Sequence, residues 1–362
     1  MRKSNSHLLR NTAMFFNWIA VALLLLSYLA GKTLPSHFAV IAIFGLIYPI
    51  ILFVNFFFVI FWMLRIDARL LLSLLVILMG IPHIRDNFSF HPGNKSETKS
   101  NFKIISYNVQ GFSRQNNAAF KPKIKKDILI FLRKEAPDII CLQEYSGKIS
   151  DLFRGKNSSH AYYHSYYTQK GSKNTGLIIV SKYKIINRNY LKFKGYRTFG
   201  IFTDLTLKND TLRLLNVHLA SISMEQADLD LLTKPPLPAW EKQNVRHHFL
   251  DIYHKLQKAF RLRERQLTVV LKTIKASPYP VVLCGDFNDT PSSNAYHRVA
   301  SVLTDAFVTK GNGLCATYAG PLPFLRIDYL LTSPKLKVTS YKKYHLRFSD
   351  HFPIQVTIKT GN

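Results

Sequence analysis

Six short polar clusters, each next to an apolar run, hold the residues of this chain whose types could do chemistry. They combine carboxylates, imidazoles and amides, and in chain order they are Ser106-Tyr107-Asn108, Gln143-Glu144, Asn216-Val217-His218, Gly285-Asp286-Phe287-Asn288, Arg326-Ile327-Asp328 and Ser349-Asp350-His351. Mg²⁺ prefers oxygen ligands such as carboxylates, and imidazoles can exchange protons near neutral pH. In an α/β protein the side chains at strand ends converge on one rim, where sites form. The pattern therefore predicts one site with metal and phosphate chemistry.

The elements that must position these clusters lie after residue 101. Strand candidates cover 103–108, 138–143, 176–181, 201–207, 211–218, 280–285, 326–332 and 352–358, and helix candidates cover 122–135 and 251–275. Strands that alternate with helices, several of them in adjacent pairs, indicate an α/β domain of stacked mixed sheets with helices outside. We place this catalytic domain at residues 102–362.

The chain carries a strong excess of cations. Its 362 residues include 49 Lys and Arg against 21 Asp and Glu, which gives a formal charge of +28. This excess favours an anionic partner such as nucleic acid, anionic lipid or another phosphoester, although a generally basic, solubilising surface would look the same. The three cysteines form no CxxC pair, so neither a disulfide framework nor a zinc site is expected from them.

The first 84 residues differ from the rest because they consist of three apolar runs. The runs cover about 14–31, 38–64 and 70–84, and few polar residues interrupt them. A membrane-spanning helix needs about 20 apolar residues, so the first two runs fit well and the third is short. We expect a transmembrane anchor at 1–84 with about three helices, and a re-entrant or interfacial third segment is the alternative. The polar stretch 85–101 is predicted to be a linker.

Cations near the ends of these runs predict the orientation of the anchor. Arg2, Lys3 and Arg10 precede the first run, and Arg65 and Arg69 lie between the second and the third. By the positive-inside rule the N-terminus is cytoplasmic, and three spans then place the catalytic domain on the outer face of the cell membrane. If the third run does not cross, that domain stays on the cytoplasmic side.

The ordered clusters over residues 102–358 resemble the endonuclease/exonuclease/phosphatase superfamily, which includes DNase I-like nucleases, inositol polyphosphate phosphatases and bacterial sphingomyelinases. The set reads N, QE, NxH, GDFN, RIDY and SDH along the chain, in the family's order. His218 points to those three branches, because exonuclease III-like enzymes lack a histidine at that place. The resemblance implies a four-layer α/β sandwich, two stacked mixed β-sheets flanked by helices. It also implies hydrolysis of a phosphoester with Mg²⁺, or with Mn²⁺ in its place.

The resemblance and the chemistry of the residues together suggest metal and water roles. Glu144 is expected to be the main metal ligand, with Asn108 orienting the metal shell and Asp350 contributing to it. Asp286 and Asn288 are two residues apart, so on extended backbone both would face the same side. Asp286 would position or deprotonate the attacking water, and Asn288 would donate to a phosphoryl oxygen. An Asx turn at this place is the alternative.

Two histidines complete the expected catalytic set. His351 would act as a base or a phosphate donor, and Asp328 would fix its tautomer, since a carboxylate orients an imidazole and stabilises its cation. His218 would donate to a non-bridging oxygen or to the leaving group. Asn216 is also expected to bind substrate, and Lys182 and Arg197 are further candidates, each with a solvated surface cation as the alternative.

Several functions remain open on this basis. The leading one is a membrane-anchored phosphodiesterase that acts on nucleic acid or on a phospholipid or sphingolipid. Residues 1–84 hold six cations and one acid, so the rest of the chain carries +23, which favours nucleic acid. The anchor favours a lipid, and a basic pocket would also suit a phosphomonoesterase acting on inositol-phosphate-like head groups. A non-catalytic membrane binding module would predict loss of at least one cluster, and all are present. No protein partner is evident.

Overall fold

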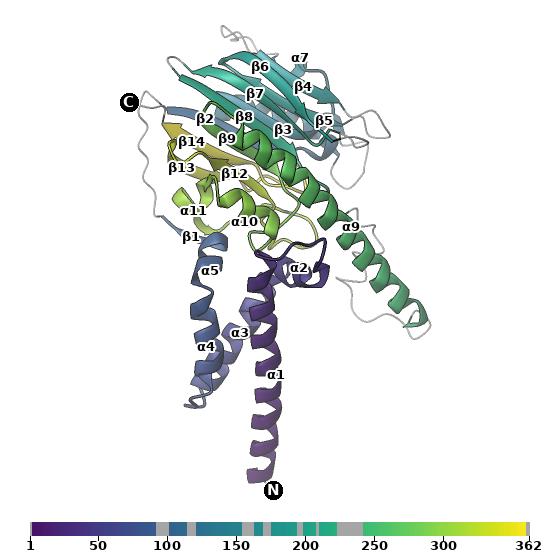
Figure 1. Cartoon of the computed structure of the whole chain (residues 1–362), viewed down its shortest axis with the longest axis vertical. Helices are drawn as coiled ribbons and strands as arrows, with labels where there is room; N and C mark the ends of the chain where they lie inside the picture. The colour runs from purple at the N-terminus through teal and green to yellow at the C-terminus, as the bar shows by residue number, and fades with distance from the viewer. Residues whose placement is uncertain are drawn as a thin grey trace.

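Two six-stranded mixed sheets stack face to face, and helices cover their outer faces (Figure 1). The computed structural model of the chain describes residues 2–91, 101–113, 121–153, 163–168, 175–193, 198–207, 210–222 and 242–359. The predicted α/β class, with two mixed sheets flanked by helices, is confirmed.

The first sheet has the strand order β10-β12-β9-β8-β7-β6. Its strands are β6 (Lys184–Leu191), β7 (Gly200–Leu207), β8 (Asp210–His218), β9 (Val281–Asp286), β10 (Thr304–Asp305) and β12 (Asp328–Thr332). Strands β8 and β9 run parallel, and the other neighbours run antiparallel. Every residue of β9 is buried, because one face of this sheet packs on the second sheet and the other packs on helices.

The second sheet has the strand order β13-β14-β2-β3-β5-β4. Its strands are β2 (Asn101–Asn108), β3 (Ile139–Tyr145), β4 (Tyr163–Thr168), β5 (Gly176–Ser181), β13 (Lys337–Lys343) and β14 (Ile354–Lys359). Only β2 and β3 run parallel in this sheet. A separate ribbon joins β1 (Phe88–Phe90) to β11 (Asn312–Leu314).

Three apolar clusters hold the layers together. The central cluster lies between the sheets and includes Ile104, Ile179 and Leu214. Helices α9 (Lys242–Lys275) and α10 (Asn294–Ala300) pack on the outer face of the first sheet. Helix α6 (Lys121–Glu135) packs on the outer face of the second sheet. The short elements η1 (Gln110–Phe112), α7 (Ser150–Phe153) and α11 (Ala306–Lys310) also belong to the domain. The domain thus has helix, sheet, sheet and helix layers, with apolar contacts at each junction.

All three cysteines are free and buried. Cys141 and Cys284 belong to the central cluster and contact each other across the two sheets. Cys315 lies elsewhere, with its sulfur 2.9 Å from the hydroxyl oxygen of Tyr341. They act as small apolar residues of the core.

Five helices make up the N-terminal segment, namely α1 (Arg2–Ala30), α2 (Ala39–Leu46), α3 (Tyr48–Met63), α4 (Leu70–Met79) and α5 (Ile81–Asn87). Among the described residues, only His7–Ala30 forms a single helix long and apolar enough to cross a membrane. Helices α2 and α3 are bent by 65° and helices α4 and α5 by 66°, so the count reaches three only if each bent pair forms one span. Pro49 and Pro82 stand at the starts of α3 and α5, where a proline cannot continue the preceding hydrogen-bond ladder. The predicted set of about three transmembrane helices is corrected accordingly.

The polar residues that interrupt the apolar runs bond to one another. The hydroxyl oxygen of Ser73 in α4 lies 2.8 Å from Asn17 Oδ1 in α1 and 3.1 Å from Asn55 Oδ1 in α3. All three side chains are fully buried. Because side-chain hydrogen bonds between helices stabilise packing where water is absent, this cluster joins α1, α3 and α4.

The N-terminal helices contact the α/β domain directly. The Thr290 hydroxyl donates to the carbonyl oxygen of Gly45 at 3.1 Å, and Asn294 Nδ2 donates to that of Gly31 at 3.2 Å. Ala39 of α2 packs in one apolar cluster with Ile252, Leu256 and Phe260 of α9. These contacts fix α2 against the domain.

Residues 85–90, which the sequence suggested as linker, are folded. They form the end of α5 and strand β1, which pairs with β11 of the α/β domain. Residues 92–100 lie outside the described residues, and Asn101, the last position of the predicted linker, begins β2.

Candidate functional site

Strand ends from both sheets meet at one edge of the sandwich. Parallel pairing puts Asn108, at the end of β2, beside Gln143 of β3, and puts His218, at the end of β8, beside Asp286 of β9. Strand β12 runs antiparallel to β9, so its first residue, Asp328, lies opposite Asp286. The last residues of β2 and β8 and the first residue of the antiparallel strand β12 therefore reach the same edge of the sandwich.

Asn108, Glu144, His218 and Asp286 form the centre of the site. Asn108 Nδ2 lies 3.0 Å from Asp286 Oδ2 and 3.3 Å from Glu144 Oε1. His218 Nε2 lies 3.7 Å from the same oxygen of each acid. The Asp286 side chain is 1% exposed, whereas those of Glu144 and His218 are each 27% exposed. The site thus has one buried carboxylate and one carboxylate that solvent or substrate can reach.

His351 lies between two buried acids. Its Nδ1 is 2.8 Å from Asp328 Oδ2, and its Nε2 is 3.6 Å from Asp286 Oδ2. Backbone N–H of Asp328 donates to the hydroxyl of Thr317, which holds this end of β12. Burial alone would lower the pKa of His351, but the carboxylates of Asp328 and Asp286 raise it well above its ordinary value. The imidazole is therefore stabilised as a cation in a fixed orientation.

Asp350 stands at the border of the site, and its contacts reveal a residue that sequence reasoning missed. Gln110 Nε2 donates to Asp350 Oδ2 at 2.9 Å, and the Gln110 backbone N–H donates to Asn108 Oδ1 at 3.0 Å. Burial raises the pKa of Asp350, and His351 partly offsets this. The only signal for Gln110 was its place two residues after Asn108. It links the end of β2 to the loop that carries Asp350 and His351.

Left-handed backbone gathers at this edge. Gln110, Glu144 and Asn288 have φ values of 47°, 51° and 52°, which non-glycine residues rarely adopt. Such conformations persist only where the surrounding structure enforces them, and they concentrate at functional sites. Three of them within one site support its assignment as functional.

Asn288 departs from the extended backbone that its spacing from Asp286 suggested. An Asx turn forms instead, because the Asn288 backbone N–H donates to Asp286 Oδ1 at 2.8 Å. Asn288 Nδ2 donates to the carbonyl oxygen of Leu219 at 3.0 Å, which ties the loops after β8 and β9 together. One amide hydrogen of Asn288 is thereby used, and the second is left for another acceptor.

Arg263 of α9 is a second residue that sequence reasoning missed. Its guanidinium donates to the carbonyl oxygen of Asn288 and lies 3.3 Å from Asp289 Oδ2. Burial raises the pKa of Asp289, and Arg263 lowers it again. Within α9 this arginine resembles the other basic residues of an amphipathic helix, and nothing local marks it as buried. It holds the loop that follows Asp286.

The family follows from this geometry and from sequence comparison. A family model described as the endonuclease/exonuclease/phosphatase family matches residues 105–351, more than half of the chain. The chain belongs to this family. Members of the endonuclease/exonuclease/phosphatase family are metal-dependent hydrolases of phosphoester bonds, and this chain is an enzyme of that type. A second model, described as a domain of unknown function (DUF8431), matches residues 10–87. No curated protein matches the sequence.

Solved structures share the fold at low sequence identity. An endonuclease/exonuclease/phosphatase from Beutenbergia cavernae has a TM-score of 0.52 at 16% identity, over 73% of this chain and 72% of that chain. One from Bacteroides vulgatus has 0.52 at 15%, over 73% and 100%. The human Nocturnin catalytic domain, solved with a bound sulfate anion, has 0.50 at 17%, over 73% and 96%. At such identities the likeness shows the fold of the family and no more.

Asn216, expected to bind substrate, lies inside the endonuclease/exonuclease/phosphatase core. Its side chain is fully buried, and its Nδ2 donates to the carbonyl oxygens of Leu142 and Ile178 in the opposite sheet. Gln143 Nε2 donates to Asn216 Oδ1 at 2.7 Å. The prediction of substrate contact is wrong for Asn216, because all of its polar atoms are used between the sheets. Asn216 and Gln143 instead bridge the sheets directly beneath the site.

Of the other two predicted substrate-binding residues, the structure describes only Lys182. Lys182 follows β5, which runs antiparallel to β3, so it lies beside the start of β3 and away from Glu144 near that strand's end. Its Nζ pairs with Asp138 Oδ1 at 3.0 Å. Lys182 therefore lies away from the residues of the site and is partly exposed. Arg197 lies outside the described residues.

The donor set fits a divalent metal. Glu144, Asp286 and Asp350 offer carboxylate oxygens, the hard ligands that Mg²⁺ and Mn²⁺ take, and Asn108 orients the first two through its amide nitrogen. Asp286, Asp328 and His351 also bring one ligand atom each within 4.8 Å of one another. The outer acids Glu144 and Asp350 are the more exposed ones, so a metal would sit where substrate can reach it.

Proposed function

We propose that this family member is a membrane-anchored, Mg²⁺-dependent phosphodiesterase that acts on phospholipid head groups at the membrane surface. The main support is that two of the loops next to site residues contact the N-terminal helices or the cluster they form with α9. The loop after Asp286 bonds to α2 through Thr290 and Gly45. The loop after His218 reaches Ile222, which packs against the cluster of Ala39 and α9. A site joined to the anchor in this way would act on substrate held in the same membrane.

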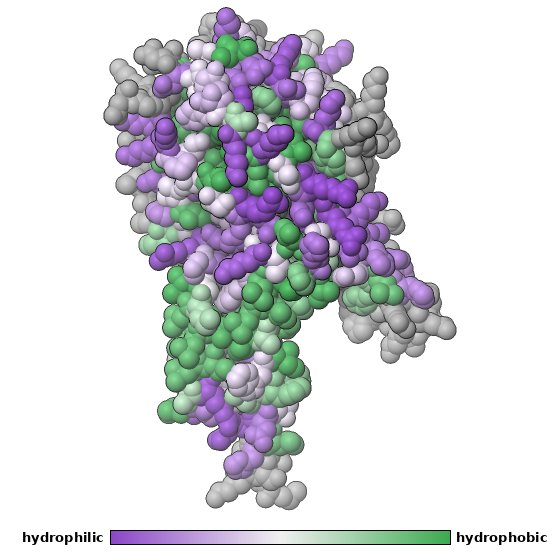
Figure 2. Space-filling view, viewed as in Figure 1, coloured by the Kyte–Doolittle hydropathy of each residue, from purple (hydrophilic) through white to green (hydrophobic). Residues whose placement is uncertain are grey.

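The surface supports the anchor. Figure 2 shows a continuous hydrophobic band over the N-terminal helices, bounded by hydrophilic residues at the far end and by the α/β domain at the other. Its most exposed apolar side chains include Phe53, Leu64 and Met79. Contiguous apolar surface of this size marks a membrane or a protein partner, and the apolar, long helix His7–Ala30 favours the membrane.

The orientation proposed for the anchor keeps the catalytic domain outside. Figure 1 places the N-terminus and the turn between α3 and α4 at the end far from the α/β domain. Arg65 and Arg69 lie in that turn, and Arg10 lies near the start of α1. Cations at this end support a cytoplasmic location for it, which puts the catalytic domain on the outer face.

Each side chain of the site has a role in the proposed reaction. Glu144 and Asp350 would hold Mg²⁺, with Asn108 orienting the metal shell through its bond to Glu144, and the ion when bound neutralises charge on the phosphoryl oxygens. Asp286 would orient the attacking water and accept its proton, since it is buried and fixed by Asn108 and the Asx turn. His218 and His351 flank Asp286, so a hydroxide formed beside Asp286 would lie next to two imidazoles that can stabilise its charge.

The imidazoles would stabilise the pentacoordinate transition state. His351, held as a cation by Asp328, would donate to a phosphoryl oxygen through Nε2. His218, more exposed, would donate to a second oxygen or to the leaving group. Asn288 would offer its free amide hydrogen to the same phosphoryl group.

A substrate comparison tests the proposal. Full-length protein in detergent would be assayed with Mg²⁺ on vesicles of phosphatidylglycerol and, separately, on plasmid DNA, with EDTA and Glu144→Gln as controls. The expected result is metal-dependent release of a phosphorylated head group that the variant lacks. Glutamine keeps the size of Glu144 and removes its charge, so folding should survive. Metal-dependent cutting of DNA with no lipid turnover would overturn the lipid assignment.

Nucleic acid is the second candidate because the chain beyond residue 84 carries +23. Inositol-phosphate-like monoesters are the third, and they would give inorganic phosphate as product. If one of these is turned over in place of the lipid, and EDTA or Glu144→Gln abolishes that turnover, the substrate assignment would change. The assignment of the catalytic residues would stand. No metal-dependent turnover of any of the three would overturn both.

A further inference from the structure

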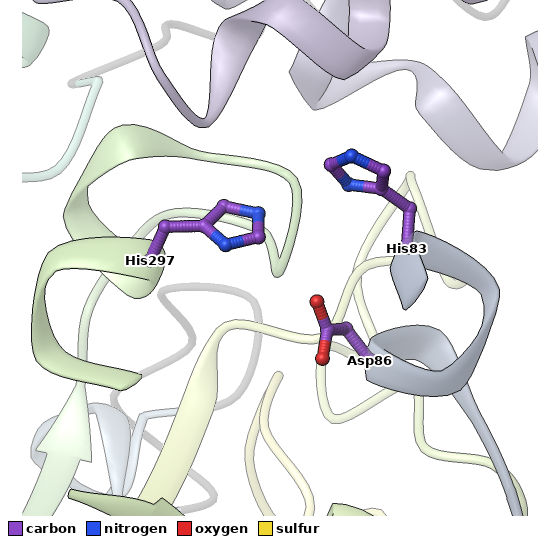
Figure 3. A group of neighbouring side chains, drawn as sticks. All are labelled: His83, Asp86 and His297. Atoms are coloured by element: carbon purple, nitrogen blue, oxygen red, sulfur yellow. The ribbon is translucent and has the colours of Figure 1, made fainter. Parts of the chain in front are cut away.

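A second group of metal-ligating side chains lies where the N-terminal helices meet the α/β domain. His83 and Asp86 come from α5 and are three residues apart, so they lie on one face of that helix. His297 comes from α10 of the domain. One ligand atom of each residue lies within 4.8 Å of the others. Figure 3 shows the three side chains converging from the two helices.

The two imidazoles are oriented by ring contacts, and each leaves a buried nitrogen without a partner. His83 stacks on Tyr28 at 4.8 Å with an interplanar angle of 12°, and it meets His297 edge to face at 5.3 Å. His83 Nδ1 and His297 Nε2 are buried and have no hydrogen-bond partner. Because a buried polar nitrogen without a partner is costly, its retention points to a ligand.

Asp86 keeps its carboxylate available. The Tyr296 hydroxyl donates to its Oδ1 at the long distance of 3.5 Å. The neighbouring guanidinium of Arg326 bonds to the backbone oxygen of Asp86 and to the carboxylate of Asp305. The positive charge of Lys32 lies near both imidazoles and disfavours a bound metal ion. The Lys32 side chain is exposed, however, so solvent screens its charge.

We propose that His83, Asp86 and His297 form a second metal site, of the zinc class, that fastens the N-terminal helices to the catalytic domain. Two imidazoles and one carboxylate suit Zn²⁺ and leave its fourth position to water, whereas Mg²⁺ prefers oxygen ligands only. The site is separate from the catalytic one, which uses strand ends of the two sheets. It rests on the fold alone and does not depend on the proposed substrate.

The position of the site explains why a fastening role is favoured. Beside it, Asn294 Nδ2 bonds to the carbonyl oxygen of Gly31, and a Cβ on Gly31 would come within 2.3 Å of the His297 ring. The two parts of the chain are therefore in close contact at this point, and only glycine allows the approach. A metal held by ligands from both parts would resist their separation.

Zinc content and Co²⁺ absorption test the site in full-length protein. The background is Glu144→Gln, which removes the main expected metal ligand of the catalytic site. In it, His83→Gln/His297→Gln is compared with the matched control His247→Gln/His345→Gln, whose histidines are exposed. We expect the control to retain about one zinc ion per chain after gel filtration and to give visible Co²⁺ absorption. The site variant should lose both.

A stability measurement keeps the test decisive if either variant folds poorly. Zn²⁺ should raise the melting temperature of the wild type and the control, and the single conservative variant Asp86→Asn should lose most of that rise. Equal zinc content in the site variant and the control, or no zinc-dependent signal in the wild type, would overturn the site. Metal-dependent hydrolysis, measured on the wild type and on His83→Gln/His297→Gln in a chain with an intact catalytic site, reports the catalytic proposal separately.

Discussion

Oδ2 of Asp328 lies 2.8 Å from Nδ1 of His351, and the other nitrogen of that ring faces Asp286 Oδ2 at 3.6 Å. The contact joins the start of β12 to the segment just before β14, so it bridges the two sheets at the site. Both Asp328 and His351 are buried, which leaves the imidazole one orientation and one direction in which to donate.

Asp328→Asn should reduce kcat by about 10²–10⁴-fold, the range for loss of a positioned acid or base. The amide removes the charge that stabilises the imidazolium and can favour the wrong tautomer, while its size is unchanged. Steady-state kinetics with circular dichroism would measure turnover and folding together. Asp210→Asn, exposed at the other end of β8, is the matched control and should leave kcat unchanged. An unchanged kcat in Asp328→Asn would remove Asp328 from the mechanism.

The stability of the metal-free protein should fall as the pH rises above neutral. The pKa of His351 is raised in the folded state, so its contribution is complete below its unfolded value of 6.5 and is lost as the pH rises through the folded value. Urea unfolding in EDTA across this range would measure the slope, and His351→Gln should flatten it. If His351→Gln has the same slope as the wild type, the imidazole is not held as a cation.

Gly285→Ala should prevent stable folding or cost more than about 3 kcal/mol of the free energy of unfolding. Gly285 has a φ of 136°, and an added Cβ would lie 1.9 Å from the carbonyl oxygen of Val217 in the neighbouring strand. Gly313→Ala is the control, since its φ is 74° and nothing lies within 4 Å of the added carbon. It should cost about 1–2 kcal/mol, from backbone strain alone. Equal losses in chemical denaturation would mean that the strand contact does not matter.

Arg263→Met should destabilise the protein by about 3–5 kcal/mol, because it leaves the buried Asp289 without its charge partner. Asp289→Asn in the same chain should recover part of the loss by removing the orphaned charge. A double-mutant cycle in urea would measure this coupling. Additive effects of the two substitutions would show that the ion pair contributes nothing.

The central strands and the residues that follow them could be predicted from sequence. Strands β2, β3, β8 and β9 are largely buried and each contains a short aliphatic stretch followed by polar residues. Strands β4, β6 and β13 lie at or beside sheet edges and were not predicted. In β6, for instance, most side chains are exposed, so no apolar pattern marks it.

The direction of each strand decides which predicted site residues meet. Asn108 and Glu144 end or nearly end parallel strands and reach the site, whereas Lys182 ends an antiparallel one and does not. Sequence spacing gives the ends of a strand but not its direction. Arg263 was beyond prediction for another reason, since its partners come from a loop about 25 residues further along the chain.

The contact between Cys141 and Cys284 makes it possible to measure how often the two sheets separate. Both thiols are sealed between the sheets, so a thiol reagent can reach them only when the sheets come apart. Under conditions where the reaction is slower than closing, the rate of labelling then reports the population of the opened state. Cys315, buried beside Tyr341 at another place, reports a different opening. The wild-type sequence thus carries two native probes, and the ratio of their labelling rates separates partial from complete loss of structure.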